Sequence, residues 1–158
     1  MAKDVGPEHV TLGGLKAIAA NLWGELAAGS VVWLTGDLGS GKTTFVQAVA
    51  VAARAEAARS PSFALVHEYE SPSGTLAHVD CYRLRDPEEA MDLDFPGLQR
   101  DARLLLVEWP EKAGGYAPEP DAHLAFSHAD DPEHICQGRI LRAVRPSDLQ
   151  PGCLRRTP

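Results

Sequence analysis

The feature that most constrains this 158-residue sequence is a glycine-rich segment, GDLGSGKT at positions 36–43, directly after an apolar run at 31–35. The apolar run predicts a buried strand, and the glycines permit backbone conformations in which successive N–H groups point at phosphate oxygens. The residues that follow are expected to begin a helix, whose N-terminus favours negative charge. The segment therefore predicts a loop that binds the phosphates of a nucleoside triphosphate.

Two side chains of this loop have distinct expected roles. Lys42 is expected to bridge the β- and γ-phosphates as a point charge, and the Thr43 hydroxyl to occupy a coordination position on magnesium. ATP and Mg²⁺ are thus the expected ligands. The position of the motif between a strand and a helix argues against a chance glycine turn.

Length and composition are those of one globular domain. With 44% apolar residues, we expect residues 1–145 to form a single domain and the polar, proline-rich residues 146–158 to form a flexible tail. The three cysteines have no zinc-ligand or redox spacing, and no segment is apolar and long enough to be a signal or to span a bilayer. We therefore expect a cytoplasmic protein without zinc or membrane contact. Its net charge of −7 argues against a chain that holds nucleic acid by itself.

The pattern of apolar residues predicts an α/β fold. Helical spacing predicts a first helix from Thr11, its expected N-cap, toward Gly29. Further helices are expected at 44–58 and 86–93, and further strands at 63–70, 75–80, 104–107, 122–127 and 139–144. The first two of these strands form an expected hairpin and the last two an antiparallel pair at the sheet edge. The expected architecture is a P-loop NTPase-like three-layer sandwich with a mixed central sheet and an antiparallel edge.

Two predicted strands end in carboxylates, Asp80 and Glu108. A phosphate loop needs an acid that holds magnesium opposite Thr43 and an acid that aims a water, and ligands of such folds lie at the carboxyl ends of the strands. Either carboxylate could serve on the metal side, and both could be ordinary surface residues. Trp109 follows Glu108 and either lines the site or only packs.

The segment Ser60-Pro61-Ser62 lies beyond the second predicted helix, where the chain returns toward the phosphates. A small loop with hydroxyl groups at this place could sense the γ-phosphate. The alternative is a simple helix stop, which the composition alone favours.

Four motifs occur in one order along the chain: GDLGSGKTTF at 36–45, SPSF at 60–63, HVDCYRL at 78–84 and VEWPEK at 107–112. This set resembles the TsaE family, bacterial ATPases that assist in making threonylcarbamoyladenosine in tRNA, over about residues 8–145. The resemblance implies a small ATPase that acts with two partners, TsaB and TsaD. Their complex transfers the threonylcarbamoyl group to the adenosine beside the anticodon, so tRNA is contacted indirectly, and ATP hydrolysis resets that complex.

The resemblance also implies roles for single residues. Thr43 and Glu108 would ligate magnesium, Asp80 would be the Walker B-like acid, and Trp109 would flank the site. The residues Ser60, Pro61 and Ser62 would form a switch-like loop. The expected catalytic residues are Lys42, Asp80 and Glu108. The expected nucleotide-binding residues are Thr11, Asp37, Leu38, Gly39, Ser40, Gly41, Lys42, Thr43, Thr44, Asp80, Glu108 and Arg139.

Two other functions are compatible with the same loop: a small P-loop kinase, and a nucleotide-gated binding module with negligible turnover. A kinase usually carries an arginine-bearing lid, whereas Lys112 is the sole cation between Trp109 and Asp121. The absence of a clear arginine finger predicts weak turnover by the chain alone, raised or gated by a partner.

Overall fold

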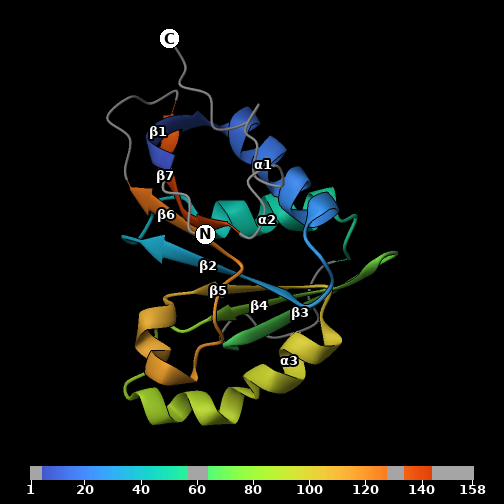
Figure 1. Cartoon of the computed structure of the whole chain (residues 1–158), viewed down its shortest axis with the longest axis vertical. Coiled ribbons are helices and arrows are strands. Elements are labelled where there is room, and N and C mark those ends of the chain that lie inside the picture. The colour runs from blue at the N-terminus through green and yellow to red at the C-terminus, as the bar shows by residue number, and fades with distance from the viewer. Residues whose placement is uncertain (1–4, 57–63, 128–133, 144–158) are drawn as a thin grey trace.

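The centre of the fold is a mixed β-sheet (Figure 1), and the computed structural model describes residues 5–56, 64–127 and 134–143. Within these residues, seven strands lie in the order β1-β7-β6-β2-β5-β4-β3. Strands β6, β2, β5 and β4 run parallel, whereas β3 at one end and β7 and β1 at the other pair antiparallel. The strands are β1 (Val5–Thr11), β2 (Ser30–Gly36), β3 (Val66–Ser71), β4 (Gly74–Asp80), β5 (Leu104–Glu108), β6 (Ala122–Ser127) and β7 (His134–Ala143).

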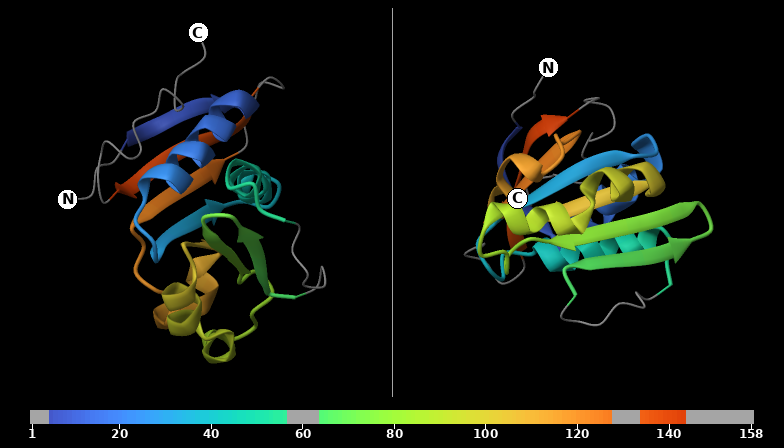
Figure 2. Two further views of the ribbon diagram at one scale, coloured as in Figure 1. Left: turned by 90° about the vertical axis from the view of Figure 1, so that its right-hand side faces the viewer. Right: turned by 90° about the horizontal axis from the view of Figure 1, so that it is seen from below.

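Helices cover both faces of this sheet and give the predicted three layers (Figures 1 and 2). Helices α1 (Leu12–Glu25) and α2 (Lys42–Ala52) pack together on one face. The other face carries α3 (Phe95–Asp101) and two short 3-10 segments, η1 (Pro87–Leu93) and η2 (Pro110–Tyr116). The sheet therefore separates two apolar cores.

The central strands explain why their sequences are apolar without alternation. In β2, Val32 and Leu34 pack into the core under α1 and α2, whereas Val31 faces the opposite core. In β5, Leu105 and Leu106 likewise face opposite cores, and both are fully buried. Burial of each such side chain stabilises the fold by about 1.5–3 kcal/mol. The predicted strands at 31–35 and 104–107 are thus confirmed, each buried on both faces.

The first helix follows its predicted apolar face. It begins at Leu12, directly after Thr11, and buries Leu15, Ile18, Ala19, Leu22 and Trp23. It ends at Glu25, a few residues before Gly29, whose φ of +83° turns the chain toward β2. The prediction of a helix from Thr11 toward Gly29 is confirmed in its position, and Leu15, Ala19 and Leu22 of the expected apolar face are buried, whereas Leu12 is exposed.

The second helix is shorter than the predicted segment 44–58, because it ends at Ala52. Arg54 then adopts a left-handed φ of +56°, and the Ala55 N–H donates to the Ala50 carbonyl at 2.9 Å. The Glu56 N–H next donates to the Glu70 carbonyl of β3, also at 2.9 Å, so the chain joins the sheet. These hydrogen bonds override the helix propensity of the alanines. The predicted switch-like residues Ser60, Pro61 and Ser62 lie outside the described residues.

The hairpin and the antiparallel pair are confirmed, with one correction at the sheet edge. Strands β3 and β4 form the predicted hairpin, and β6 pairs antiparallel with β7. However, β7 begins at His134 instead of residue 139, and β1 covers its outer side. The edge strand is therefore β1. The sequence did not predict it because Gly6 and Pro7 disfavour a strand, and long-range pairing with β7 supplies its hydrogen bonds.

The sequence also did not predict α3. The side chain of Asp94 caps this helix by accepting from the Gly97 N–H at 3.2 Å, and Pro96 lies in the first turn. Such a cap and proline are recognisable helix-start signals. The helix has only seven residues, which is too few to show the helical spacing of apolar residues, so the cap and the proline alone did not predict it.

Candidate nucleotide-binding site

The glycine-rich loop connects β2 to α2 and depends on three glycines in the left-handed half of φ space. Gly36, Gly39 and Gly41 have φ of +134°, +75° and +115°. A Cβ on Gly36 would lie 2.1 Å from the Phe126 carbonyl oxygen, so only glycine fits beside β6. Gly41 is the N-cap of α2, and no side chain caps the helix there. The first N–H groups of α2 are therefore available for an anion.

Lys42 is turned back onto its own loop. Its ammonium donates to the carbonyls of Gly36 and Asp37, the latter at 2.8 Å, and lies 4.5 Å from the centre of the Trp109 ring. The side chain is buried, and burial lowers the pKa of Lys42 against the opposing attraction of Glu108 and Asp80. The loop thus holds a desolvated cation next to the place where phosphates are expected.

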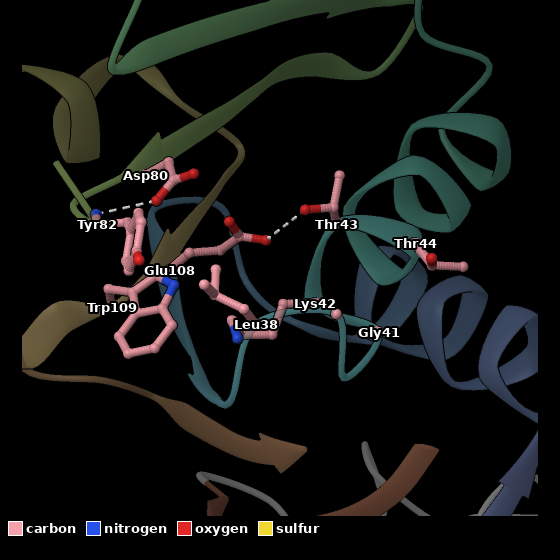
Figure 3. Close-up of a pocket in the computed structure, with 10 residues that line it drawn as sticks. Leu38, Gly41, Lys42, Thr43, Thr44, Asp80, Tyr82, Glu108 and Trp109 are labelled. Carbon is pink, nitrogen blue, oxygen red and sulfur yellow. Dashed lines mark hydrogen bonds between the residues drawn. The ribbon is translucent and has the colours of Figure 1, made fainter. Parts of the chain in front are cut away.

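Ser40 shapes the loop from inside. Its hydroxyl donates to the Asp37 carbonyl at 2.6 Å, its N–H donates to the same oxygen at 3.2 Å, and the residue is fully buried. Among the predicted loop residues, Asp37 and Ser40 do not line the pocket. The pocket is lined by Leu38, Gly39, Gly41, Lys42, Thr43, Thr44, Asp80, Tyr82, Glu108 and Trp109 (Figure 3).

The two predicted carboxylates meet at the carboxyl edge of the sheet. Asp80 ends β4 and Glu108 ends β5, and the two residues lie directly opposite each other in the parallel register. The Thr43 hydroxyl donates to Glu108 Oε1 at 3.4 Å, the contact drawn as a dashed line in Figure 3. Glu108 is only 2% exposed. The structure thus brings the predicted metal ligands, Thr43 and Glu108, together at the entrance of α2.

Asp80 differs from Glu108 in its partners. Its Oδ1 accepts the Tyr82 N–H at 3.0 Å. Burial raises the pKa of the Asp80 carboxyl, and the negative charge of Glu108 adds to this effect. A carboxylate with a raised pKa accepts a proton more readily than one in water. The two acids therefore have different hydrogen-bond partners, the Tyr82 N–H for Asp80 and the Thr43 hydroxyl for Glu108.

The predicted flanking residue, Trp109, closes one side of the pocket. Its backbone is left-handed, with φ of +55°, and its N–H donates to the Leu34 carbonyl at 3.3 Å. Its ring also contacts Tyr82, with 5.0 Å between the ring centres. Backbone strain of this kind, about 1–2 kcal/mol for a residue with a Cβ, often occurs at functional sites.

His78 is a site residue for which the sequence predicted no role. Its Nε2 lies 3.6 Å from Glu108 Oε2, on the side of the carboxylate away from Thr43. The signal was the alternation along β4, which places His78 on the same face as Asp80, two residues later. The neighbouring strand was needed to show that this face also holds Glu108.

A second cavity of about 290 Å³ adjoins the loop pocket through Thr43 and Asp80, which line both. Its other walls come from the β3–β4 hairpin and the residues that flank it. They are formed by Ala64, Leu65, His67, Tyr69, His78 and Arg83. The side of the site toward β3 is therefore open enough to admit water.

The two remote candidates for nucleotide contact are placed only by their backbone. Thr11 is the last residue of β1, and Arg139 lies within β7. The positions of both side chains lie outside the described part of the structure, so their predicted contacts stay predictions.

The donor set was tested for its fit to a metal ion. Among the described side chains, no three His, Cys, Asp or Glu residues gather as a metal-binding group. Mg²⁺ in phosphate-transferring sites is usually held by one or two protein oxygens together with substrate phosphates and waters. The Thr43 hydroxyl and the Glu108 carboxylate fit that arrangement.

Among the described residues, no helix has the length and apolar character required to cross a membrane.

Comparison with known proteins identifies the relatives of this chain. The profile of the family described as "Threonylcarbamoyl adenosine biosynthesis protein TsaE" matches residues 11–137. The chain belongs to the TsaE family. The TsaE protein of Haemophilus influenzae is 37% identical over 109 residues, which cover 66% of this chain and 67% of that protein. The TsaE protein of Rickettsia bellii is 35% identical over 133 residues, which cover 82% of this chain and 88% of that protein.

A solved structure shares the fold of this chain. The crystal structure of YdiB from Bacillus subtilis matches with a TM-score of 0.70 at 26% identity, covering 93% of this chain and 90% of that one. The predicted α/β, P-loop NTPase-like architecture is therefore confirmed. The family also confirms the resemblance carried by the four motifs at 36–45, 60–63, 78–84 and 107–112.

Proposed function

We propose that this TsaE-family chain is a magnesium-dependent ATPase that serves the formation of threonylcarbamoyladenosine in tRNA by binding and resetting a complex of TsaB and TsaD. The family description and the names of the relatives support the place in tRNA modification. The observation that carries the ATPase proposal is the contact of Thr43 with Glu108 beside an uncapped helix N-terminus and a buried lysine. That combination suits a metal-bound triphosphate.

In the proposed reaction, the chain's own residues bind the phosphates, orient them and take a proton from the attacking water. Lys42 leaves the carbonyls of Gly36 and Asp37 and pairs with the β- and γ-phosphate oxygens, while the amides at the start of α2 cradle the phosphates. Thr43 and Glu108 would hold Mg²⁺, which would neutralise charge on the phosphates.

We propose Asp80 as the base because it lines the open cavity toward β3, which Glu108 does not, and because burial raises the pKa of the Asp80 carboxyl. A water oxygen attacks the γ-phosphorus, the bond from that phosphorus to the bridging oxygen of ADP breaks, and the water proton passes to Asp80. The products are ADP and inorganic phosphate.

Turnover by the chain alone is expected to be slow. No arginine lines the loop pocket within the described residues, and Arg83 lines only the adjoining cavity. An arginine finger accelerates phosphoryl transfer by about 10³–10⁵-fold. We therefore propose that TsaB and TsaD raise or gate the turnover, with tRNA held by the complex and not by this chain.

The deciding experiment compares Lys42→Ala and Glu108→Ala with Glu111→Ala, an exposed acid outside the pocket lining. Phosphate release is measured with and without TsaB–TsaD, and thermal unfolding monitors the fold. We expect both site variants to lose activity by at least 10²-fold with the fold intact, whereas Glu111→Ala keeps activity close to wild type. Unchanged turnover in both site variants would exclude the assignment.

The same assay separates the two alternatives. Nucleotide binding without turnover, even in the presence of TsaB–TsaD, would favour a nucleotide-gated binding module. Transfer of the γ-phosphoryl group to an added small acceptor would favour a kinase. Among the described residues, the loop pocket of about 150 Å³ is bounded by the aromatic pair Tyr82 and Trp109 and has no cationic lid, which favours hydrolysis over phosphoryl transfer to an acceptor.

A further inference from the structure

His78 is a buried polar residue whose imidazole lacks a hydrogen bond at Nε2 among the described contacts. It lies in β4 with 7% of its surface exposed, and its Nε2 has no hydrogen-bond partner within normal distance in the described structure. A buried polar atom without a partner costs about 1–3 kcal/mol. The Oε2 atom of Glu108 lies 3.6 Å from this nitrogen.

The sheet itself places these two side chains together. In β4, Ala77 and Val79 pack into the core under η1 and α3, so His78 faces the α2 side, as Leu76 does. In β5, Leu106 packs on that α2 side, so Glu108, two residues later, lies on the same side. His78 pairs in the parallel register with Leu106, which lies two residues before Glu108. The strand pairing thus holds the imidazole beneath the carboxylate.

The orientation of the imidazole is also restricted. Its ring stacks on that of His67 from β3, with 5.9 Å between the ring centres and 23° between the ring planes. His67 and His78 are direct partners in the antiparallel register. A neighbour stacked on one face restricts the plane of the ring, and in that plane Nε2 lies toward Glu108.

We propose that His78 is a positioning residue for the metal-side carboxylate, an inference that rests on the ATPase function proposed above. In this proposal, the 3.6 Å separation of His78 Nε2 from Glu108 Oε2 shortens to a hydrogen bond that the Nε2–H donates, and this bond keeps Oε1 directed at the Thr43 hydroxyl. Partners of this kind, which hold a metal-ligating carboxylate in place, typically change metal affinity or activity by about 10–100-fold. Glu108 then has both oxygens engaged, which leaves Asp80 free to act on water.

The test uses three substitutions that separate a hydrogen bond from mere bulk. In His78→Gln, the side-chain amide nitrogen is the same number of bonds from Cα as His Nε2, so it can reach Glu108. In His78→Asn, the amide matches the position of Nδ1 and falls short. His78→Phe keeps the ring without a donor. Thermal unfolding of each variant verifies the fold.

The main readout is the Mg²⁺ dependence of ADP binding by the purified chain, with kcat and KM for ATP measured in parallel. We expect His78→Asn and His78→Phe to need about 10–100-fold more Mg²⁺ and to lose kcat, while ADP affinity without metal and KM change little. His78→Gln is expected to recover most of both quantities. A loss in His78→Gln as large as in His78→Phe, or no loss in any variant, would overturn the proposal.

A second measurement is independent of turnover. Nitrogen-15 NMR of the histidines at neutral pH reports whether Nε2 of His78 carries a proton, and Glu108→Gln should shift that resonance. A bare Nε2, or a resonance insensitive to Glu108→Gln, would overturn the proposal even if the variants fold poorly. If wild type failed to hydrolyse ATP while this bond was present, the proposed function would fail and the positioning role would stand.

Discussion

At the residue scale, the glycine-rich loop supplies hydrogen-bond acceptors to its own lysine in the absence of any ligand. The Lys42 ammonium donates to two loop carbonyls, those of Gly36 and Asp37, and lies against the face of Trp109. A buried ammonium without such partners would be strongly destabilising. Binding of phosphates must therefore exchange carbonyl partners for phosphate oxygens, and it must change the surroundings of Trp109.

This exchange leads to a prediction for tryptophan fluorescence. The chain has three tryptophans, Trp23, Trp33 and Trp109, and among the described contacts only Trp109 lies over the loop lysine. We expect Mg²⁺–ADP to change the emission intensity because the ammonium leaves the indole face. Trp109→Phe should abolish the change. Trp33→Phe should keep it, since the Trp33 indole donates to the Pro118 carbonyl on the other face of the sheet.

The control for this prediction is a direct binding measurement, such as calorimetry, on each variant. It ensures that a silent signal in Trp109→Phe does not come from lost affinity. An equal fluorescence change in Trp109→Phe and wild type, at saturating nucleotide, would contradict the proposed movement of Lys42.

The residues of the candidate site differ in how far the sequence could predict them. Lys42 and Thr43 belong to one short motif whose chemistry requires them. Glu108 and Trp109 end a strongly apolar run, so local patterns made them candidates, and the family resemblance gave them their expected roles. His78 could not be predicted in this way. Its role depends on the pairing of β4 with β5, and no pattern along the chain specifies which strands are neighbours.

At the element scale, the central strands beside the site could be predicted because a strand buried on both faces has a continuous run of apolar residues. β2 and β5 are buried on both faces and read as continuous apolar runs. Two of the errors, at β1 and at the end of α2, fall where hydrogen bonds between distant segments decide the structure. β1 needs β7, and α2 ends where Glu56 pairs with Glu70. Such pairings are tertiary and override local propensity.

The junction of β2 with the loop gives a stability prediction that tests this close packing. Gly36 has φ of +134°, and a Cβ there would lie 2.1 Å from the Phe126 carbonyl oxygen, a backbone atom that cannot move without shifting β6. Gly36→Ala is therefore expected to lower the free energy of unfolding by about 3 kcal/mol. Denaturant unfolding monitored by circular dichroism measures this change.

Gly24 provides the matched control for this substitution. It lies in the last turn of α1, and a Cβ there would meet no atom within 4 Å. Gly24→Ala should raise the free energy of unfolding by about 0.5 kcal/mol, because alanine favours the helix over glycine. Similar effects of the two substitutions would show that crowding against β6 does not govern the loop.

At the scale of the whole molecule, anion binding is local. The chain carries a net charge of −7, yet the loop pocket offers uncapped helix N–H groups and one buried lysine. Such a site suits a compact triphosphate neutralised by magnesium, because directed dipoles act over a single helical turn. A tRNA backbone, in contrast, needs many lysines and arginines spread over a surface.

This contrast predicts how tRNA associates with the protein. Fluorescence anisotropy with labelled tRNA in about 150 mM salt should detect no specific binding by the chain alone, because too few cations are available to release counterions from the phosphates. Binding should be seen when TsaB and TsaD are added. Mg²⁺–ADP binding under the same conditions serves as the control that the chain is active. Saturable tRNA binding by the chain alone, weakening steeply as salt is raised, would show instead that this acidic molecule contacts the tRNA directly.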